Sequence, residues 1–184
     1  VMRGDETQLL GLYTAMPGFT GPVCLPGTHS KWVDFDGGHI SNTRTVMTGE
    51  FFGLLSSQSI LRHSLPDAAN TKQPVADFLL GVENGFAEPA ALISKLFSIR
   101  AGDLLANGTN AETRSSYLSG LLIGSEFAMQ AGAHRAESIA IVGASGLAGL
   151  YKRAAKHLGY DVQVFSGDEM VLAGLSAVYE ENFQ

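Results

Sequence analysis

The 184-residue sequence predicts an α/β fold with a mixed sheet of about five strands and helices flanking it. Two observations predict this class. Near the start, three short runs rich in β-branched and aromatic residues follow one another at hairpin spacing, and a block of helical patterns comes next. The chain then ends in the order strand, helix, strand, helix, which is typical of parallel strands joined by a crossover helix. The length predicts one compact domain or one large lobe of a bigger protein.

The first part of the chain is predicted to hold one helix and three antiparallel strands. The helix is expected over residues 5–12, and a Gly/Pro-rich connection over 13–22. The strands are expected over residues 23–25, 31–36 and 39–45. Gly37 and Gly38 separate the last two strands, and glycines in a two-residue loop favour a hairpin turn.

The remaining elements are predicted from hydrophobic periodicity and from end signals. Helices are expected over 48–61, 74–85, 90–100, 110–130, 146–158 and 170–181, and strands over 138–142 and 161–165. Thr109 and Glu112 predict a capping box for the longest helix, and Gly159 predicts a C′ helix end. Gly120 and Gly124 fall inside a helical pattern, where each costs about 1 kcal/mol relative to alanine. We therefore expect a close helix contact at this pair.

The composition excludes several classes of function. The net charge is −6 with no basic stripe, so we expect no nucleic-acid partner. No apolar run approaches the length of a membrane span, and the first residues carry no signal-peptide pattern, so we expect no membrane partner. Cys24 is the one cysteine, which excludes a disulfide framework or a cysteine-based metal site and favours the cytoplasm. The sequence leaves the oligomeric state open.

The turn between the first two strands is the most informative stretch. Gly27, Thr28, His29 and Ser30 form a tight turn that exposes several backbone N–H groups and two hydroxyls. Such a concave array binds anions, and glycine lets the backbone approach the ligand. Lys31 adds a positive charge. The alternatives are a solvated surface role for Lys31 and a turn-capping role for His29.

A second glycine turn lies between a predicted strand and helix near the end of the chain. Its residues Gly143, Ala144, Ser145 and Gly146 come close to the dinucleotide fingerprint, and Asp168 follows the next strand. A dinucleotide fold normally begins with this unit and continues with further parallel strands, whereas only one more helix follows here. We favour a nucleotide contact at this turn over a helix start that merely packs on a sheet.

Three longer motifs follow one another along the chain. They are Met2-Arg3-Gly4-Asp5-Glu6-Thr7-Gln8-Leu9-Leu10-Gly11, Leu25-Pro26-Gly27-Thr28-His29-Ser30-Lys31-Trp32 and Arg44-Thr45-Val46-Met47-Thr48-Gly49-Glu50. In this order they resemble the 2-dehydro-3-deoxygalactonokinase family, and residues 118–124, Gly167-Asp168 and Ala173-Gly174 match as well. The family is similar to the actin-like ATPase superfamily. The resemblance therefore implies a ribonuclease H-like lobe, one of two lobes with ATP between them.

The resemblance also implies an activity and a domain organisation. The activity is a sugar-acid kinase that transfers the γ-phosphate of ATP, with Mg²⁺, to the terminal (C6) hydroxyl of 2-dehydro-3-deoxy-D-galactonate. Residues 1–184 would form a single C-terminal lobe, in which 1–22 lead in from the other lobe and 23–184 bind the nucleotide. The N-terminal lobe, with a second phosphate hairpin, would be absent, so we expect no turnover by this chain alone.

The resemblance further implies roles for residues near the start. Related sugar kinases carry a Gly-Asp-Gln-type motif whose aspartate accepts the hydroxyl proton, and Gly4-Asp5-Glu6 resembles it. Asp5 is the expected base and Glu6 the alternative, although the helix dipole also favours acids here. Arg3 is a candidate for binding the substrate carboxylate, with an ordinary surface role as the equal alternative. Thr48 is expected to cap a helix.

Two other functions remain open from the sequence. One is a nucleotide-binding regulatory or scaffold protein of the same superfamily, without catalysis. The other is an NAD(P)-dependent oxidoreductase, which rests on residues 143–149 alone.

Overall fold

The computed structural model describes the chain except residues 1, 3, 67–72, 106–107, 132–137 and 184. The chain divides into two compact units. The first comprises Val1–Val46 with Ala136–Gln184, and the second Met47–Arg135. The strands lie in the first unit, and the described part of the second is helical.

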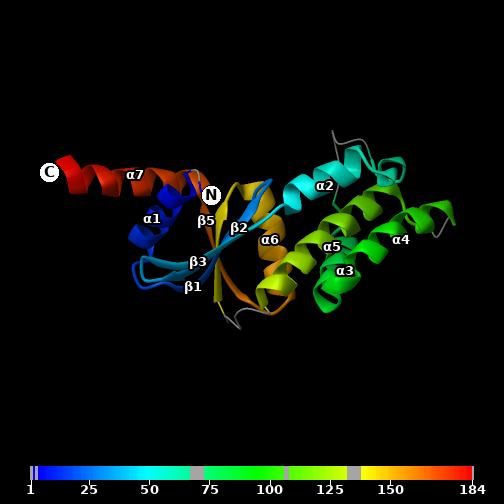
Figure 1. Cartoon of the computed structure of the whole chain (residues 1–184), viewed down its shortest axis with the longest axis horizontal. Helices are drawn as coiled ribbons and strands as arrows, with labels where there is room; N and C mark the ends of the chain where they lie inside the picture. The colour runs from blue at the N-terminus through cyan, green and yellow to red at the C-terminus, as the bar shows by residue number, and fades with distance from the viewer. Residues whose placement is uncertain (1, 3, 67–72, 106–107, 132–137, 184) are drawn as a thin grey trace. The chain divides into compact units, whose positions relative to one another are not determined.

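The first unit is built on a five-stranded mixed sheet with the order β3-β2-β1-β4-β5 (Figure 1). Its strands are β1 (Thr20–Leu25), β2 (Ser30–Asp36), β3 (His39–Val46), β4 (Ser138–Gly143) and β5 (Asp161–Ser166). The first three pair antiparallel in sequence order, whereas β4 pairs parallel with both β1 and β5. The predicted α/β class and the number of strands are confirmed.

Burial and turn chemistry explain these strands. The central strands β1 and β4 each contain a continuous buried apolar run, over residues 22–25 and 139–142, because both of their faces are covered there. Val23, Cys24, Ala140 and Ile141 have no exposed surface. The edge strand β3 is exposed along nearly its whole length. Asp36 pairs with His39 across the two-residue loop, where Gly37 and Gly38 have φ of 53° and 97°. Positive φ at both positions is the requirement of a type I′ turn.

Three helices complete this unit: α1 (Asp5–Ala15), α6 (Ser145–His157) and α7 (Gly167–Phe183). Leu9 and Leu12 of α1 and Met170 of α7 form one core with side chains of β1, β2 and β4. The backbones of α1 and α7 lie in direct contact, since a Cβ on Gly11 would overlap the Met170 carbonyl and a Cβ on Gly174 would overlap that of Thr7. Glycine is therefore required for this helix pair.

Helix α6 ends as the sequence predicts. Gly159 has φ of 88° and donates to the Lys156 carbonyl at 3.1 Å, while Tyr160 donates to the Ala155 carbonyl at 3.0 Å. This is the Schellman arrangement, with Gly159 at C′.

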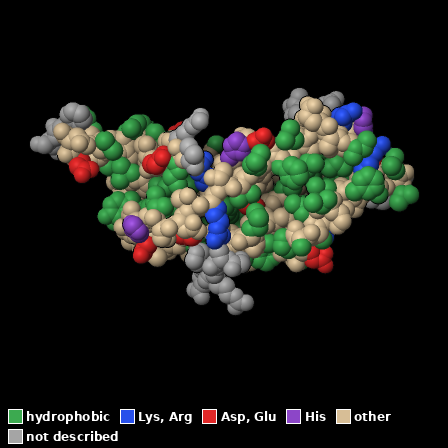
Figure 2. All heavy atoms as spheres, viewed as in Figure 1, with side chains coloured by type: hydrophobic (Ala, Val, Ile, Leu, Met, Phe, Trp, Pro, Cys, Tyr) green, Lys and Arg blue, Asp and Glu red, His purple; other side chains and the backbone are tan. Residues whose placement is uncertain are grey.

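The second unit contains α2 (Thr48–Ser57), η1 (Ile60–His63), α3 (Val75–Ala87), η2 (Pro89–Ala91), α4 (Leu92–Leu104) and α5 (Ala111–Ala131). Helices α3 and α5 meet through two glycine pairs, Gly81 with Gly85 and Gly120 with Gly124. A Cβ at any of the four would overlap backbone of the facing helix, so the close contact expected at Gly120 and Gly124 is confirmed. Figure 2 shows hydrophobic side chains gathered over this unit, and several are exposed, among them Phe51, Leu54, Ile93 and Phe97.

Three local predictions for this unit are wrong. The helix expected over 48–61 stops at Ser57, and Ser59 instead caps the start of the 3-10 helix η1, where its hydroxyl accepts the Leu61 N–H at 3.0 Å. The capping box lies one residue later than expected, between Asn110 and Thr113.

The third wrong prediction is the capping role of Thr48. No side chain caps the start of α2, and the Thr48 hydroxyl instead donates a buried hydrogen bond to the Glu126 carboxylate of α5.

Among the described residues, no helix combines the length and hydropathy needed to cross a bilayer.

Candidate functional site

The candidate site lies at one edge of the sheet in the first unit. Strands β1, β4 and β5 run parallel, so their carboxyl ends meet at this edge. The turn over residues 26–29 follows β1, residue 144 follows β4, and α7 follows β5 directly. In open α/β sheets this edge is where ligands bind.

The two glycine turns predicted from the sequence are neighbours in space. A Cβ placed on Gly143 would lie 3.4 Å from Pro26 Cδ and 3.7 Å from the Pro26 carbonyl oxygen. A Cβ on Gly167 would lie 3.4 Å from Gly143 Cα. Three backbone segments therefore converge at the edge, within van der Waals reach of one another.

The first turn presents its residues unequally. Thr28 and His29 are exposed, and Gly27 is half-buried. Ser30 is fully buried, and its hydroxyl shares a 2.8 Å hydrogen bond with the Tyr151 hydroxyl. The sequence predicts that both hydroxyls of the turn face an anion. Thr28 is exposed to solvent, whereas the Ser30 hydroxyl is directed into the core toward Tyr151 of α6.

Lys31 forms an ion pair with Asp5. The two charged groups are 3.1 Å apart, and the side chains are only 16% and 17% exposed. The alternative of a solvated surface lysine is therefore wrong. The ion pair places the expected catalytic base directly beside the strand that leaves the first turn.

The second turn leads into an open helix start. Ala144 precedes α6 as its N-cap residue and makes no side-chain capping bond, and Ser145 and Gly146 open the helix. All three are exposed, and no atom lies within 4 Å of a Cβ placed on Gly146. No acidic residue stands in the first turn of α6, so its backbone N–H groups suit an anion such as phosphate.

The start of α7 differs from that of α6. Its first turn carries Asp168 and Glu169, and the Ser166 hydroxyl accepts the Glu169 N–H at 3.4 Å. Acidic side chains already complement the dipole of this helix, so α6 is the better anion site of the two.

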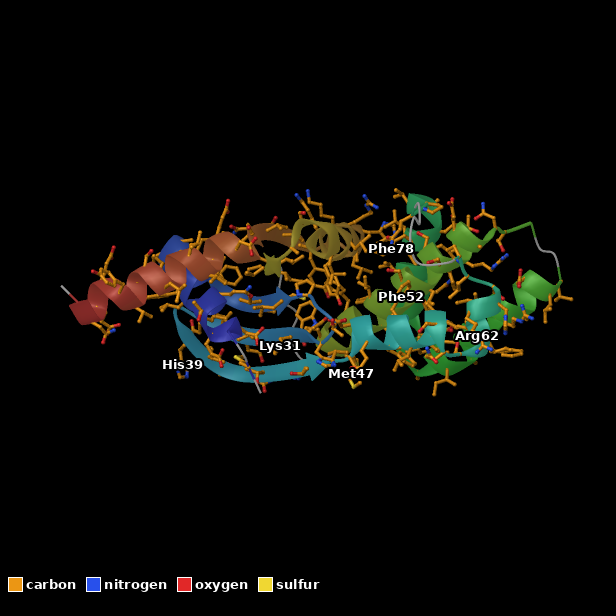
Figure 3. All side chains as sticks on the ribbon, turned by 90° about the horizontal axis from the view of Figure 1, so that it is seen from above. Lys31, His39, Met47, Phe52, Arg62 and Phe78 are labelled. Carbon is orange, nitrogen blue, oxygen red and sulfur yellow. The ribbon has the colours of Figure 1, made fainter. Side chains whose placement is uncertain are left out.

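Asp5 and Glu6 have different surroundings although they are adjacent. Glu6 lines a groove of about 470 Å³ between α1 and the β2–β3 hairpin, with Tyr13 and His39 among its lining residues. His39 pairs with Asp36 at the hairpin turn, and Lys31 pairs with Thr45 at the other end (Figure 3). Asp5 therefore lies toward the first glycine turn, and Glu6 faces the groove.

Arg3 lies outside the described residues. Gln8 was missed by the sequence reasoning, and its Nε2 atom would lie 3.1 Å from a Cβ on Gly167. Gln8 stands three positions after Asp5 on α1, and this spacing on one helix face is the signal that could have found it.

The described residues contain no group of three or more His, Cys, Asp or Glu side chains that could hold a metal ion. Mg²⁺ commonly binds through one or two carboxylates together with substrate phosphates and water. The donors present are thus compatible with a magnesium ion that a nucleotide brings.

The chain matches known proteins along most of its length. Residues 1–178 match the protein family described as 2-keto-3-deoxy-galactonokinase. A protein of Rhizobium meliloti (strain 1021) named as a 2-dehydro-3-deoxygalactonokinase is 41% identical over 178 residues, which are 96% of this chain and 58% of that protein. The 2-dehydro-3-deoxygalactonokinase of Escherichia coli (strain K12) is 38% identical over 180 residues, 97% of this chain and 59% of that protein.

A solved structure agrees with these matches. It is a crystal structure of a protein assigned as a 2-dehydro-3-deoxygalactonokinase from Sinorhizobium meliloti, with a TM-score of 0.93 and 40% identity. The alignment covers 100% of this chain and 61% of that one. The chain therefore spans about three fifths of the length of the relatives it matches.

Proposed function

Because the chain belongs to the 2-keto-3-deoxy-galactonokinase family, we propose that it supplies the nucleotide-binding part of a sugar-acid kinase. The kinase transfers the γ-phosphate of ATP to the terminal C6 hydroxyl of 2-dehydro-3-deoxy-D-galactonate. One observation carries the proposal: two glycine turns meet at the carboxyl edge of the sheet, with the Asp5–Lys31 ion pair beside the first of them.

The proposal assigns the phosphates to the first turn. The backbone N–H groups of Gly27, Thr28 and His29 and the Thr28 hydroxyl would donate to the β- and γ-phosphates. Phosphoryl transfer depends mostly on positioning and on charge stabilisation, which such donors provide. Ser30 and Lys31 would act from the strand behind the turn, Ser30 through Tyr151 and Lys31 through its ion pair with Asp5 and its positive charge.

The second turn would hold the adenosine end of the nucleotide. Gly143 lies next to Pro26 of the first turn, and Ala144, Ser145 and Gly146 form the exposed start of α6. The open space over Gly146 leaves room for a ligand to approach the backbone.

Asp5 would accept the proton of the sugar hydroxyl. Its ion pair with Lys31 fixes the Asp5 carboxylate beside the first glycine turn. Glu6 is not part of this ion pair and lines the groove instead. Mg²⁺ bound to the nucleotide phosphates would neutralise part of their charge. We place the Arg3 guanidinium at the substrate carboxylate on the strength of the family motif alone.

The relatives are longer than this chain, and we propose that residues 1–184 correspond to the C-terminal lobe of such a kinase. Residues 1–22 would lead in from the other lobe, and residues 23–184 would bind the nucleotide. The cytoplasm, expected from the single cysteine, remains a prediction. Neither alternative, a nucleotide-binding protein without catalysis or an NAD(P)-dependent oxidoreductase, is favoured by the family match.

Binding and turnover test the proposal separately. Isothermal titration calorimetry of the 184-residue chain with ADP, ATP and NAD⁺, with and without Mg²⁺, should show binding of the adenine nucleotides and none of NAD⁺. A full-length kinase containing this sequence should consume ATP only when 2-dehydro-3-deoxygalactonate is added. ATP binding without sugar-acid-dependent turnover in that longer protein would favour the non-catalytic alternative, and preferential NAD⁺ binding would overturn the proposal.

A further inference from the structure

The first glycine turn is the proposed phosphate turn, and it leads into β2. The first two residues of β2, Ser30 and Lys31, connect it to helices on opposite faces of the sheet. Successive side chains of a strand point to opposite faces, so Ser30 and Lys31 point apart. Lys31 reaches Asp5 of α1 on one face, and Ser30 reaches Tyr151 of α6 on the other. The strand that leaves the turn is therefore fixed to two helices within two residues.

The contact between Ser30 and Tyr151 is fully enclosed. Ser30 is 0% exposed and Tyr151 is 1% exposed, and their hydroxyl oxygens are 2.8 Å apart. A buried hydroxyl that loses its partner keeps the penalty of having left water, so this bond holds both groups firmly in place.

Tyr151 belongs to the helix that begins at the second glycine turn. It stands six positions after Ser145, the first residue of α6. The bond therefore joins the exit of the first turn to the helix whose start forms the second turn. It supplements the strand pairing Cys24–Ile141 and the approach of Pro26 to Gly143, which hold the two turns at their base.

We propose that Tyr151 is a positioning residue for nucleotide binding, which sets the spacing between the phosphate turn and the second turn through the Ser30 hydroxyl. The inference rests on the proposed nucleotide function of these turns. Both side chains are buried, so neither hydroxyl would touch the nucleotide. A ligand that spans both turns depends on their spacing, whereas a ligand that occupies one turn does not.

The test compares ligands that span the turns with ligands that do not. Tyr151→Phe and Ser30→Ala each remove one hydroxyl with little change of shape, and the double variant removes both. Tyr13→Phe is the matched control, since Tyr13 lines the groove at the hairpin and contacts Gly38. For each variant, affinities for ADP, adenosine and pyrophosphate are measured by titration, together with the unfolding midpoint.

The proposal expects both single variants to bind ADP roughly 3- to 10-fold more weakly, the scale of one net hydrogen bond. Adenosine and pyrophosphate should bind as they do to the wild type, and the double variant should bind ADP no more weakly than either single variant. Tyr13→Phe should match the wild type with every ligand.

Three other results would overturn the proposal. If the unfolding midpoint falls while ADP affinity is unchanged, the bond is only structural. If all three ligands weaken equally, the variant has damaged the site in general. If the wild type itself binds neither ADP nor adenosine, the proposed nucleotide function fails first, and this result is distinct from the other two.

Discussion

At the scale of single residues, the two adjacent acids that open α1 have different surroundings. Asp5 and Glu6 both lie in the first helical turn, where the dipole stabilises either of them. Of the two, Asp5 pairs with Lys31 beside the first glycine turn, and Glu6 lines the groove with Tyr13 and His39. The ion pair with Lys31 is therefore the feature that favours Asp5 over Glu6 as the proposed base.

Exchange of each acid for its amide should separate the two roles. In a full-length kinase that contains this sequence, Asp5→Asn should lower kcat by about 10²- to 10⁴-fold, the usual contribution of a positioned general base. Glu6→Gln should change kcat by no more than a few fold. A coupled assay of ADP release checks both variants. An equal loss in the two variants, or no loss in Asp5→Asn, would contradict the assignment.

At the scale of elements, glycine pairs decide which helices lie in contact. Gly120 and Gly124 of α5 face Gly81 and Gly85 of α3, and each position sits against backbone of the other helix. The relatively poor helix propensity of glycine is offset by this close approach, because no residue with a Cβ fits there.

A comparison of two glycines in this unit tests the argument. Gly120→Ala should lower the free energy of unfolding by about 1–3 kcal/mol, because the new Cβ overlaps the Phe78 carbonyl and forces the helices apart. Gly53→Ala in α2 should instead raise it by about 0.5–1 kcal/mol, because a Cβ there meets no atom within 4 Å. Urea unfolding followed by circular dichroism measures both. Similar effects of the two changes would show that packing does not select glycine at position 120.

An ion network in the same unit joins α4 to α5 and to Ser64, the residue that follows η1. Asp103 of α4 accepts hydrogen bonds from the Ser64 hydroxyl at 2.7 Å and from Arg100 at 2.9 Å, and it pairs with Arg114 of α5 at 2.9 Å. The Ser64 hydrogen bond lowers the pKa of Asp103 most, the two guanidinium groups lower it further, and partial desolvation opposes them. The result is a pKa below the ordinary value of 3.8.

The lowered pKa predicts a dependence of stability on pH. Because the folded-state pKa lies below the unfolded value, the contribution of Asp103 is complete above pH 3.8 and is lost as the pH falls through the folded-state pKa. Asp103→Asn should therefore melt at a lower temperature than wild type at pH 7, and the gap should narrow at pH 3. Thermal unfolding at the two pH values measures the difference in melting temperature between wild type and variant. If this difference is the same at pH 7 and pH 3, the Asp103 carboxylate does not cause the dependence of stability on pH.

At the scale of the whole molecule, one unit carries the sheet edge proposed to bind the nucleotide, and the described part of the other unit is helical. The chain spans about three fifths of the length of the relatives it matches. We accordingly predict that the 184-residue chain binds ADP and ATP but does not phosphorylate 2-dehydro-3-deoxygalactonate. Calorimetry and a coupled kinase assay on the same preparation check the two halves of this prediction. Normal turnover by the chain alone would falsify it.

The sequence by itself determined the order of helices and strands, the two-glycine hairpin, the helix end at Gly159 and the two glycine turns. These features depend on local backbone chemistry. A glycine that permits a positive φ, or the hydrophobic period of a helix or strand, can be recognised within a few residues. Local signals also led to errors where two neighbouring candidates compete, as at Thr109 and Asn110 for the start of α5.

Only the tertiary structure decided which side chains share the site. It brought Gly143 against Pro26, directed Ser30 to Tyr151 and Lys31 to Asp5, and placed Gln8 beside Gly167. Each of these contacts joins segments that are distant in the sequence or depends on the face to which a strand residue points. Such contacts follow from how helices pack on both faces of the sheet, which no local pattern specifies.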